Sequence, residues 1–169
     1  MTSTTIFIDA GYLTAVSIRK NKKLNFVKLS KELVTGTWNK TIVYDALPNF
    51  NDATRYSKTQ RFHSALRKLD KFEVKLGRLQ YYKDHSPRQK GVDMKIGIDL
   101  VQMSMNQEFT HAVLISGDSD FLYAVQKAKE AGIHVTLAHF PETQINSKFM
   151  QSFDERFLLS DSFLDKWKI

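Results

Sequence analysis

Four aspartates are the residues of this sequence most suited to chemistry: Asp9, Asp93, Asp118 and Asp120. Asp9 directly follows one apolar run, and Asp118 closely follows another. In an open α/β sheet, residues just beyond the strands face the edge where ligands bind. Carboxylates gathered at one edge repel each other unless a cation neutralises them. We therefore predict that the four aspartates form one acidic metal pocket.

The absence of cysteine narrows the choice of metal to ions that oxygen or imidazole can hold. The five histidines, at positions 63, 85, 111, 134 and 139, are scattered without metal-ligand spacing. Oxygen ligands favour Mg²⁺ or Mn²⁺ over zinc. We expect Asp9 and Asp118 to be the primary ligands. Asp93 and Asp120 would complete the coordination directly or through water.

Helix capping is the alternative role for these acids. Asp118 and Asp120 begin a helical pattern, as does Asp93, and carboxylates there accept hydrogen bonds from free backbone N–H groups. An aspartate after a strand, as at Asp9, is also common in turns. Capping alone does not predict that all four acids meet at one sheet edge. Both roles stay open for each residue taken singly.

Two neighbours of the aspartates are candidates for supporting roles. Ser116 ends an apolar run and is placed to hydrogen-bond a metal ligand or a phosphate, although simple packing of a small residue is an equal alternative. Asp99 lies six residues beyond Asp93. It is therefore about 240° away around an ideal helix. We expect Asp99 to have a secondary role.

Positive charge is concentrated in the middle of the chain. The segment 55–95 holds 12 Lys and Arg against four acids, whereas the whole chain of 169 residues carries +7. This concentration predicts a surface that binds polyanions through phosphates, and a solvated basic helix face is the alternative. We expect Arg88, Lys90 and Lys95 to contact substrate phosphate. The interleaved aromatic residues offer stacking surfaces for bases: Tyr56, Phe72, Tyr81 and Tyr82.

Apolar runs and turn residues predict alternating strands and helices. Strands are expected at 4–8, 40–46, 72–76 and onward to Tyr82, 112–115, 133–138 and 157–159. Helices are expected from Tyr12, from Asn25 to Gly36, at 53–69 after an Asp52 cap, at 92–105, at 119–131 and after Ser160. Residues 83–91 are expected to form a polar loop. The helix at 53–69 is predicted to bury Phe62, Leu66 and Leu69.

This alternation predicts a three-layer α/β/α sandwich around a mainly parallel sheet. The length suits a single domain over residues 1–169. No stretch resembles a signal peptide or a membrane span, so we expect a soluble, cytoplasmic protein with no membrane partner. The sequence leaves the oligomeric state open.

Three motifs resemble those of the NYN family of PIN-like nucleases, bacterial type. They are FIDAG at 7–11, KGVDMK at 90–95 with Asp99-Leu100, and SGDSDF at 116–121. Their order and spacing extend the resemblance from about Thr4 into the 150s. It implies a PIN-like fold, Mg²⁺ or Mn²⁺ held by aspartates, and hydrolysis of RNA phosphodiester bonds. The positions that match the family's acids are Asp9, Asp93, Asp118 and Asp120.

Tyr12 is one departure from the family pattern, since members often carry Asn at this position. A phenol replaces an amide that supports the first aspartate, which favours a rival interpretation: a non-catalytic RNA-binding or regulatory module. A phosphatase that begins with a strand followed by D-x-D is disfavoured because position 11 is Gly. No P-loop pattern is present either. The sequence therefore predicts a metal-dependent ribonuclease, with single-stranded nucleic acid in general as the broader alternative to RNA.

Overall fold

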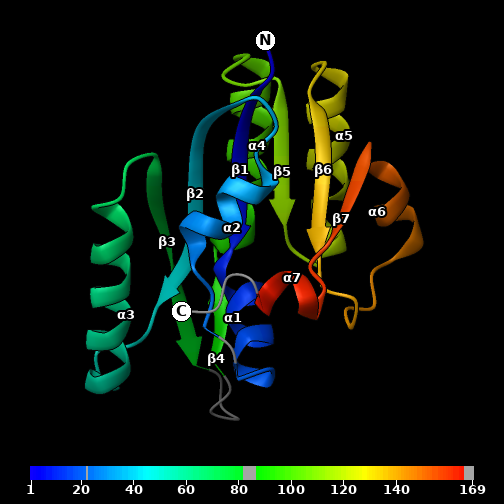
Figure 1. Ribbon diagram of the computed structural model, residues 1–169. Helices are drawn as coiled ribbons and strands as arrows, with labels where there is room; N and C mark the ends of the chain where they lie inside the picture. The colour runs from blue at the N-terminus through cyan, green and yellow to red at the C-terminus, as the bar shows by residue number, and fades with distance from the viewer. Residues whose placement is uncertain (22, 82–86, 166–169) are drawn as a thin grey trace.

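The structure, a computed structural model, describes the backbone of residues 1–21, 23–81 and 87–165. It contains a seven-stranded sheet with helices packed on its faces (Figure 1). Side chains at positions 81 and 87–90 lie outside the described part. The strands are β1 (Ser3–Asp9), β2 (Thr37–Leu47), β3 (Phe72–Tyr81), β4 (Pro87–Lys90), β5 (His111–Ile115), β6 (His134–His139) and β7 (Glu155–Leu158).

The strand order is β4-β3-β2-β1-β5-β6-β7. All neighbouring pairs are parallel except β3 with β4, which are antiparallel. β1 lies at the centre, where Asp9 pairs in register with Tyr44 of β2 and Ile8 pairs with Ile115 of β5. Because the strands are parallel, the ends of β1, β2 and β5 meet at one edge of the sheet. The predicted mainly parallel sheet is confirmed.

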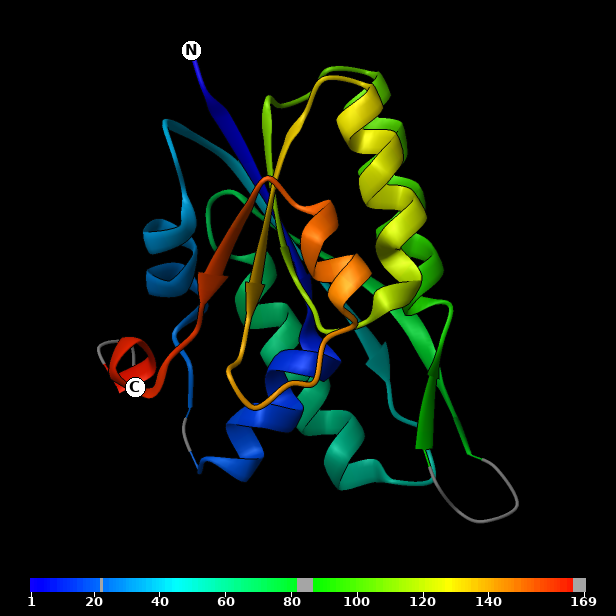
Figure 2. The same cartoon turned by 90° about the vertical axis from the view of Figure 1, so that its right-hand side faces the viewer.

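Helices cover both faces of the sheet (Figures 1 and 2). One face carries α1 (Ala10–Arg19), α2 (Phe26–Leu33), α3 (Ala53–Arg67) and α7 (Asp161–Asp165). The other carries α4 (Val92–Met105), α5 (Leu122–Glu130) and α6 (Ser147–Ser152). A short 3₁₀ turn, η1 (Ser119–Phe121), precedes α5. The predicted α/β/α sandwich is confirmed.

Two hydrophobic cores fill the spaces between the layers. Phe7 of β1 packs into the α4–α5 side, whereas Ile6 and Ile8 pack into the α1–α2 side. Successive side chains of a strand point to opposite faces, so a central strand buried on both faces is apolar without interruption. This explains why the run before Asp9 is uniformly apolar, and it fixes Asp9 where the strand leaves the core.

The structure corrects two expectations about elements and adds one helix. Part of the expected polar loop at 83–91 is instead the edge strand β4, which begins with Pro87. A proline at the first position of an edge strand sacrifices no ladder hydrogen bond. In α3, the buried residues are His63 and Leu66, while Phe62 and Leu69 are 37% and 38% exposed. Helix α6 was not expected from the sequence.

Candidate active site

Asp9 is the best-anchored acid at the edge of the sheet. It is the last residue of β1 and the N-cap of α1, and its Oδ1 accepts a hydrogen bond of 3.2 Å from the Tyr12 backbone N–H. Its Oδ2 accepts one of 3.2 Å from the Ser116 hydroxyl at the end of β5. Only 8% of Asp9 is exposed. The carboxylate therefore has a fixed orientation, set by two strands and a helix.

The turn after β5 brings two more acids to this edge. The Asp118 backbone N–H donates to Ser116 Oγ over 3.2 Å, so one hydroxyl joins Asp9 to the turn. Asp118 caps η1, because its Oδ1 accepts a 2.9 Å bond from the Asp120 N–H. Capping thus occupies one oxygen of Asp118, and capping and metal binding need not exclude each other.

Asp93 approaches from the other side of the sheet, in the first turn of α4. Gly91 precedes that helix with φ of 80°, a left-handed conformation that glycine adopts without strain. The chain can therefore turn directly from β4 into the helix, and Asp93 lines the same hollow as Asp9 and Asp118. Asp120 lines a neighbouring hollow between α4 and α5 together with Asp93.

Burial and mutual repulsion make two of these carboxyls hard to ionise. Burial, opposed by the two hydrogen bonds and reinforced by the charges of Asp93 and Asp118, raises the pKa of Asp9 from 3.8 to about 6. Loss of hydration, followed by the charges of Asp118 and Asp120, raises the pKa of Asp93. The charges that raise these two pKa values come from other aspartates of the set, Asp93 and Asp118 for Asp9, and Asp118 and Asp120 for Asp93.

No positive side chain relieves this repulsion in the described part of the chain: none of the four aspartates forms an ion pair with a cation there. Within residues 1–21, 23–81 and 87–165, no three acidic or histidine side chains are gathered closely enough to hold an ion. The donor chemistry nevertheless fits a hard divalent cation, since the site offers carboxylate oxygens whose charge is uncompensated.

Two hollows meet at Asp9 and Asp118. The larger, about 820 Å³, lies between α1, the end of β2 and α3. Its polar lining includes Asp45, Arg55, Thr59 and Asp93. The smaller, about 470 Å³, is lined by Tyr12, Arg19, Ser116, Gly117, Glu142, Thr143 and Gln144 as well. Asp9 and Asp118 therefore line both hollows.

Asp45 is an acid of this edge that the sequence reasoning missed. It lies near the end of β2, one position beyond the residue that pairs with Asp9. Its Oδ2 accepts a 2.8 Å bond from His63 Nε2, and its Oδ1 accepts a 2.8 Å bond from the Ala46 N–H. The rule used for Asp9 selects residues just beyond a strand and therefore passed over Asp45, which lies within β2 two residues before its end. Its bond to His63 ties α3 to the sheet.

Two predicted residues are engaged away from the aspartates. Asp99 accepts bonds from the Tyr44 hydroxyl at 2.7 Å and from Lys75 Nζ at 2.6 Å. Lys95 Nζ donates to the Leu76 carbonyl at 2.5 Å. Asp99 and Lys95 therefore help to join α4 to β2 and β3, and the phosphate contact expected of Lys95 stays a prediction.

Other predicted binding residues are placed as follows. The side chains of Arg88, Lys90 and Tyr81, and all of Tyr82, lie outside the described residues. Phe72 is only 7% exposed and packs edge-on against Trp38, so it is not available for stacking on a base. Among the predicted aromatic contacts within the described part, Tyr56 alone keeps partial exposure.

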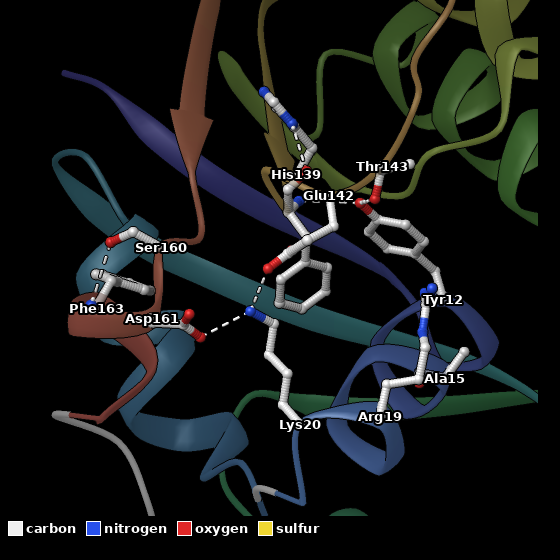
Figure 3. A network of polar contacts seen from close by, with 11 residues as sticks. Tyr12, Ala15, Arg19, Lys20, His139, Glu142, Thr143, Ser160, Asp161 and Phe163 are labelled. Atoms are coloured by element: carbon white, nitrogen blue, oxygen red, sulfur yellow. Dashed lines mark hydrogen bonds and ion pairs between the residues drawn. The ribbon is translucent and has the colours of Figure 1, made fainter.

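Tyr12 belongs to a network that joins α1 to the loop after β6 (Figure 3). Its hydroxyl lies 2.6 Å from Thr143 Oγ1 and accepts a 3.0 Å bond from the Phe140 N–H. Nearby, Lys20 pairs with Glu142 and, at 2.7 Å, with Asp161. The side chain of Tyr12 therefore closes one wall of the smaller hollow, and only its backbone N–H supports Asp9.

Comparison with known proteins identifies the class that this fold and acidic edge define. The family model of the NYN domain matches residues 3–161. The chain therefore belongs to the NYN domain family, which has a PIN-like nuclease fold. The predicted resemblance is confirmed over nearly the whole chain.

One solved structure shares the fold of this chain, and one curated protein matches part of its sequence. A solved structure of a protein of unknown function from Vibrio parahaemolyticus has a TM-score of 0.75 and 20% identity, and the match covers 96% of each chain. An uncharacterized protein, y4oD, from Sinorhizobium fredii is 32% identical over 74 residues. That match covers 44% of this chain and 33% of y4oD, about a third of the relative's length.

None of the helices in the described part of the chain is long and apolar enough to cross a membrane.

Proposed function

We propose that this protein is a metal-dependent ribonuclease that hydrolyses phosphodiester bonds at the acidic edge of its sheet. The observation that carries the proposal is Asp9: a buried carboxylate, held in place by two hydrogen bonds, that shares a hollow with Asp93 and Asp118 and has no described cation beside it. A fold that maintains such repulsion gains stability when a cation binds.

Mg²⁺ or Mn²⁺ fits the available donors, with Asp9 and Asp118 as proposed ligands and Asp93 and Asp120 completing the coordination. Such an ion would supply a water of lowered pKa and would polarise the phosphoryl oxygen. The residues of the chain prepare this chemistry. Ser116 donates to the Asp9 carboxylate and accepts from the Asp118 backbone N–H, so it ties the turn that carries Asp118 to Asp9.

Two arginine side chains are the proposed contacts for the phosphate backbone near the acids. Arg55 lines the larger hollow and Arg19 lines the smaller. Both are exposed. Guanidinium groups bind phosphate oxygens through paired hydrogen bonds. A polynucleotide lying across Asp9 and Asp118 would therefore meet a cation in each direction, which favours nucleic acid over a small phosphate ester.

A non-catalytic nucleic-acid-binding module is the second candidate, and Tyr12 is the observation that favours it. The phenol is bonded to Thr143 and Phe140, so no side-chain amide at this position supports Asp9. The two functions differ in what happens after binding. Both require nucleic acid binding, whereas only the nuclease requires an ion at the aspartates.

The test is to incubate the purified protein with end-labelled RNA and DNA in Mn²⁺, in Mg²⁺ or in chelator. Metal-dependent fragments of the RNA support the nuclease. Binding of RNA without fragments in any metal supports the second candidate. A preparation of the Asp9→Asn variant purified in the same way controls for contaminating nucleases.

A further inference from the structure

The turn between β2 and α3 presents an exposed aromatic side chain. Phe50 is 75% exposed. Its ring centroid lies 4.8 Å from that of Tyr56 on α3, with 36° between the planes. The turn is tied together by Asn49, whose carbonyl accepts from the Asp52 N–H at 3.1 Å and whose side chain accepts from the Asn51 N–H at 3.3 Å. Phe50 is therefore supported on an ordered turn while most of its surface faces solvent.

This aromatic pair borders the hollow of the candidate active site. Pro48, two residues before Phe50, lines the hollow that contains Asp9 and Asp118, and so does Arg55, the residue before Tyr56. The turn leaves the same sheet edge as Asp9, because β2 and β1 are parallel neighbours. A nucleotide with its phosphate near Arg55 would have its base within reach of the turn.

The cations next to this pair are available for phosphates. Arg55 and Lys58 are exposed, and neither forms an ion pair with a residue that the structure describes. Lys58 lines the adjoining hollow between α1 and α3, which shares Asp45 with the larger one. Positive charge and an aromatic face thus occur together along the first turns of α3.

We propose that Phe50, supported by Tyr56, is a stacking platform that selects an unpaired base of the nucleic acid, while Arg55 and Lys58 hold the adjacent phosphates. The proposal rests on the proposed function for its choice of ligand. Aromatic side chains stack on splayed, single-stranded bases of any sequence, whereas bases within a duplex are stacked on each other and are not free to do so. Phe50 would then determine a preference for single strands.

The test measures binding in chelator, so that no cleavage occurs, with a short labelled single-stranded RNA and the same RNA in a duplex. Phe50→Ala should weaken single-strand binding about tenfold and leave duplex binding unchanged, since only stacking on the ring is removed. Phe50→Leu should behave like Phe50→Ala, because leucine is apolar but has no π-face. Phe50→Tyr should retain the wild-type affinity for the single strand, because tyrosine keeps an aromatic face. Phe50 is exposed, so these variants are expected to fold, and circular dichroism verifies it.

Two results would overturn the proposal: unchanged single-strand binding by Phe50→Ala, or full affinity in Phe50→Leu, which would show a merely apolar contact. Wild-type protein that binds duplex as well as single strands, or that binds neither, also overturns it. Failure of the nuclease proposal is recognised separately, as absence of cleavage by wild-type protein in Mn²⁺. The stacking preference can hold in that case, because it is measured without metal.

Discussion

At the scale of single residues, the candidate site depends on the carboxylate of Asp9, whose burial in its charged form lowers the stability of the fold. Asp9 has a raised pKa mainly because it is buried, and its two hydrogen bonds offset only part of the missing hydration. The position of Asp9 was predictable, since an aspartate directly after an apolar run must emerge at the end of a buried strand. Two hydrogen bonds could not be predicted, that of Asp9 with Ser116 and that of Asp45 with His63, because each joins residues from separate elements of the chain.

We predict that Asp9→Asn stabilises the metal-free protein in a pH-dependent way. The pKa of Asp9 is about 6 in the folded state against 3.8 for the ordinary side chain, so folding favours the protonated form. The wild type therefore loses stability as pH rises from about 4 through 6, and above 6 the full cost is present. That cost is up to about 3 kcal/mol, at 1.36 kcal/mol per pKa unit.

Urea unfolding of both proteins in chelator, at pH 4 and at pH 7.5, measures this difference. Groups that do not interact with Asp9 titrate equally in the two proteins, so the change in the stability difference reports Asp9 together with Asp93 and Asp118, whose charges act on it. The free energy of unfolding of the variant, relative to that of the wild type, should be larger at pH 7.5 than at pH 4. A difference that is the same at both pH values would show that Asp9 ionises without cost and would remove the electrostatic reason for a cation.

At the scale of elements, the turn after β5 is held by close packing. A Cβ atom on Gly117 would lie 2.7 Å from Thr143 Cγ2 and 2.9 Å from Tyr12 Cε2. Both distances are too short for non-bonded carbon atoms, so glycine is required for the loop after β6 to reach α1. The sequence indicated a turn at this glycine but could not reveal which side chains would press against it.

Gly117→Ala should therefore destabilise the protein by about 1 to 3 kcal/mol, as overpacking does in a crowded interior, and should weaken Mn²⁺ binding by displacing Asp118. Adding Thr143→Ser should recover part of the stability, because it removes Cγ2 and keeps the hydroxyl near Tyr12. Thermal unfolding and Mn²⁺ titration of the single and double variants test this. If Thr143→Ser brings no recovery, the crowding lies elsewhere.

The elements themselves were largely predictable, and the exceptions have physical reasons. The central strands β1 and β5, buried on both faces, are apolar and were expected. The edge strand β4 was not, because its residues Pro87–Lys90 are polar and have no alternating pattern. A strand at the edge of a sheet needs neither an apolar run nor an alternating pattern, because it is only partly covered by other elements. The apolar face of α3 was misassigned since Phe62 packs against Phe26 at the surface rather than into the core.

At the scale of the molecule, acidic and basic surfaces adjoin. The basic segment 55–95 was predicted to bind polyanions, yet part of its charge serves the fold: Lys71, Lys75 and Lys95 bond to Trp38, Asp99 and Leu76. The exposed cations of α3 remain, beside the acidic hollow. Charge counting along a sequence cannot separate these two uses, because it contains no information on which cations meet carbonyls or carboxylates in space.

Binding of single-stranded RNA should weaken steeply with salt, since released counterions drive the association. Changing Arg55 and Lys58 together to Gln should lower the slope of log K against log salt by about 0.7 for each phosphate that is no longer neutralised. The matched double variant at Arg61 and Lys68, which line neither hollow, should keep the slope. Equal slopes in both double variants would contradict a phosphate path along the α1–α3 side.

The most direct test of the nuclease proposal is Asp118→Asn, assayed for Mn²⁺ affinity by calorimetry and for RNA cleavage on a gel. Asparagine keeps the oxygen that accepts from the Asp120 N–H and caps a helix about as well as aspartate, so the turn is retained while one negative charge is removed. Asp70→Asn, in an exposed turn after α3, is the matched control. We predict that Mn²⁺ affinity and cleavage collapse together in Asp118→Asn, that RNA binding in chelator survives, and that Asp70→Asn changes nothing. Full cleavage by well-folded Asp118→Asn would contradict the proposed metal site.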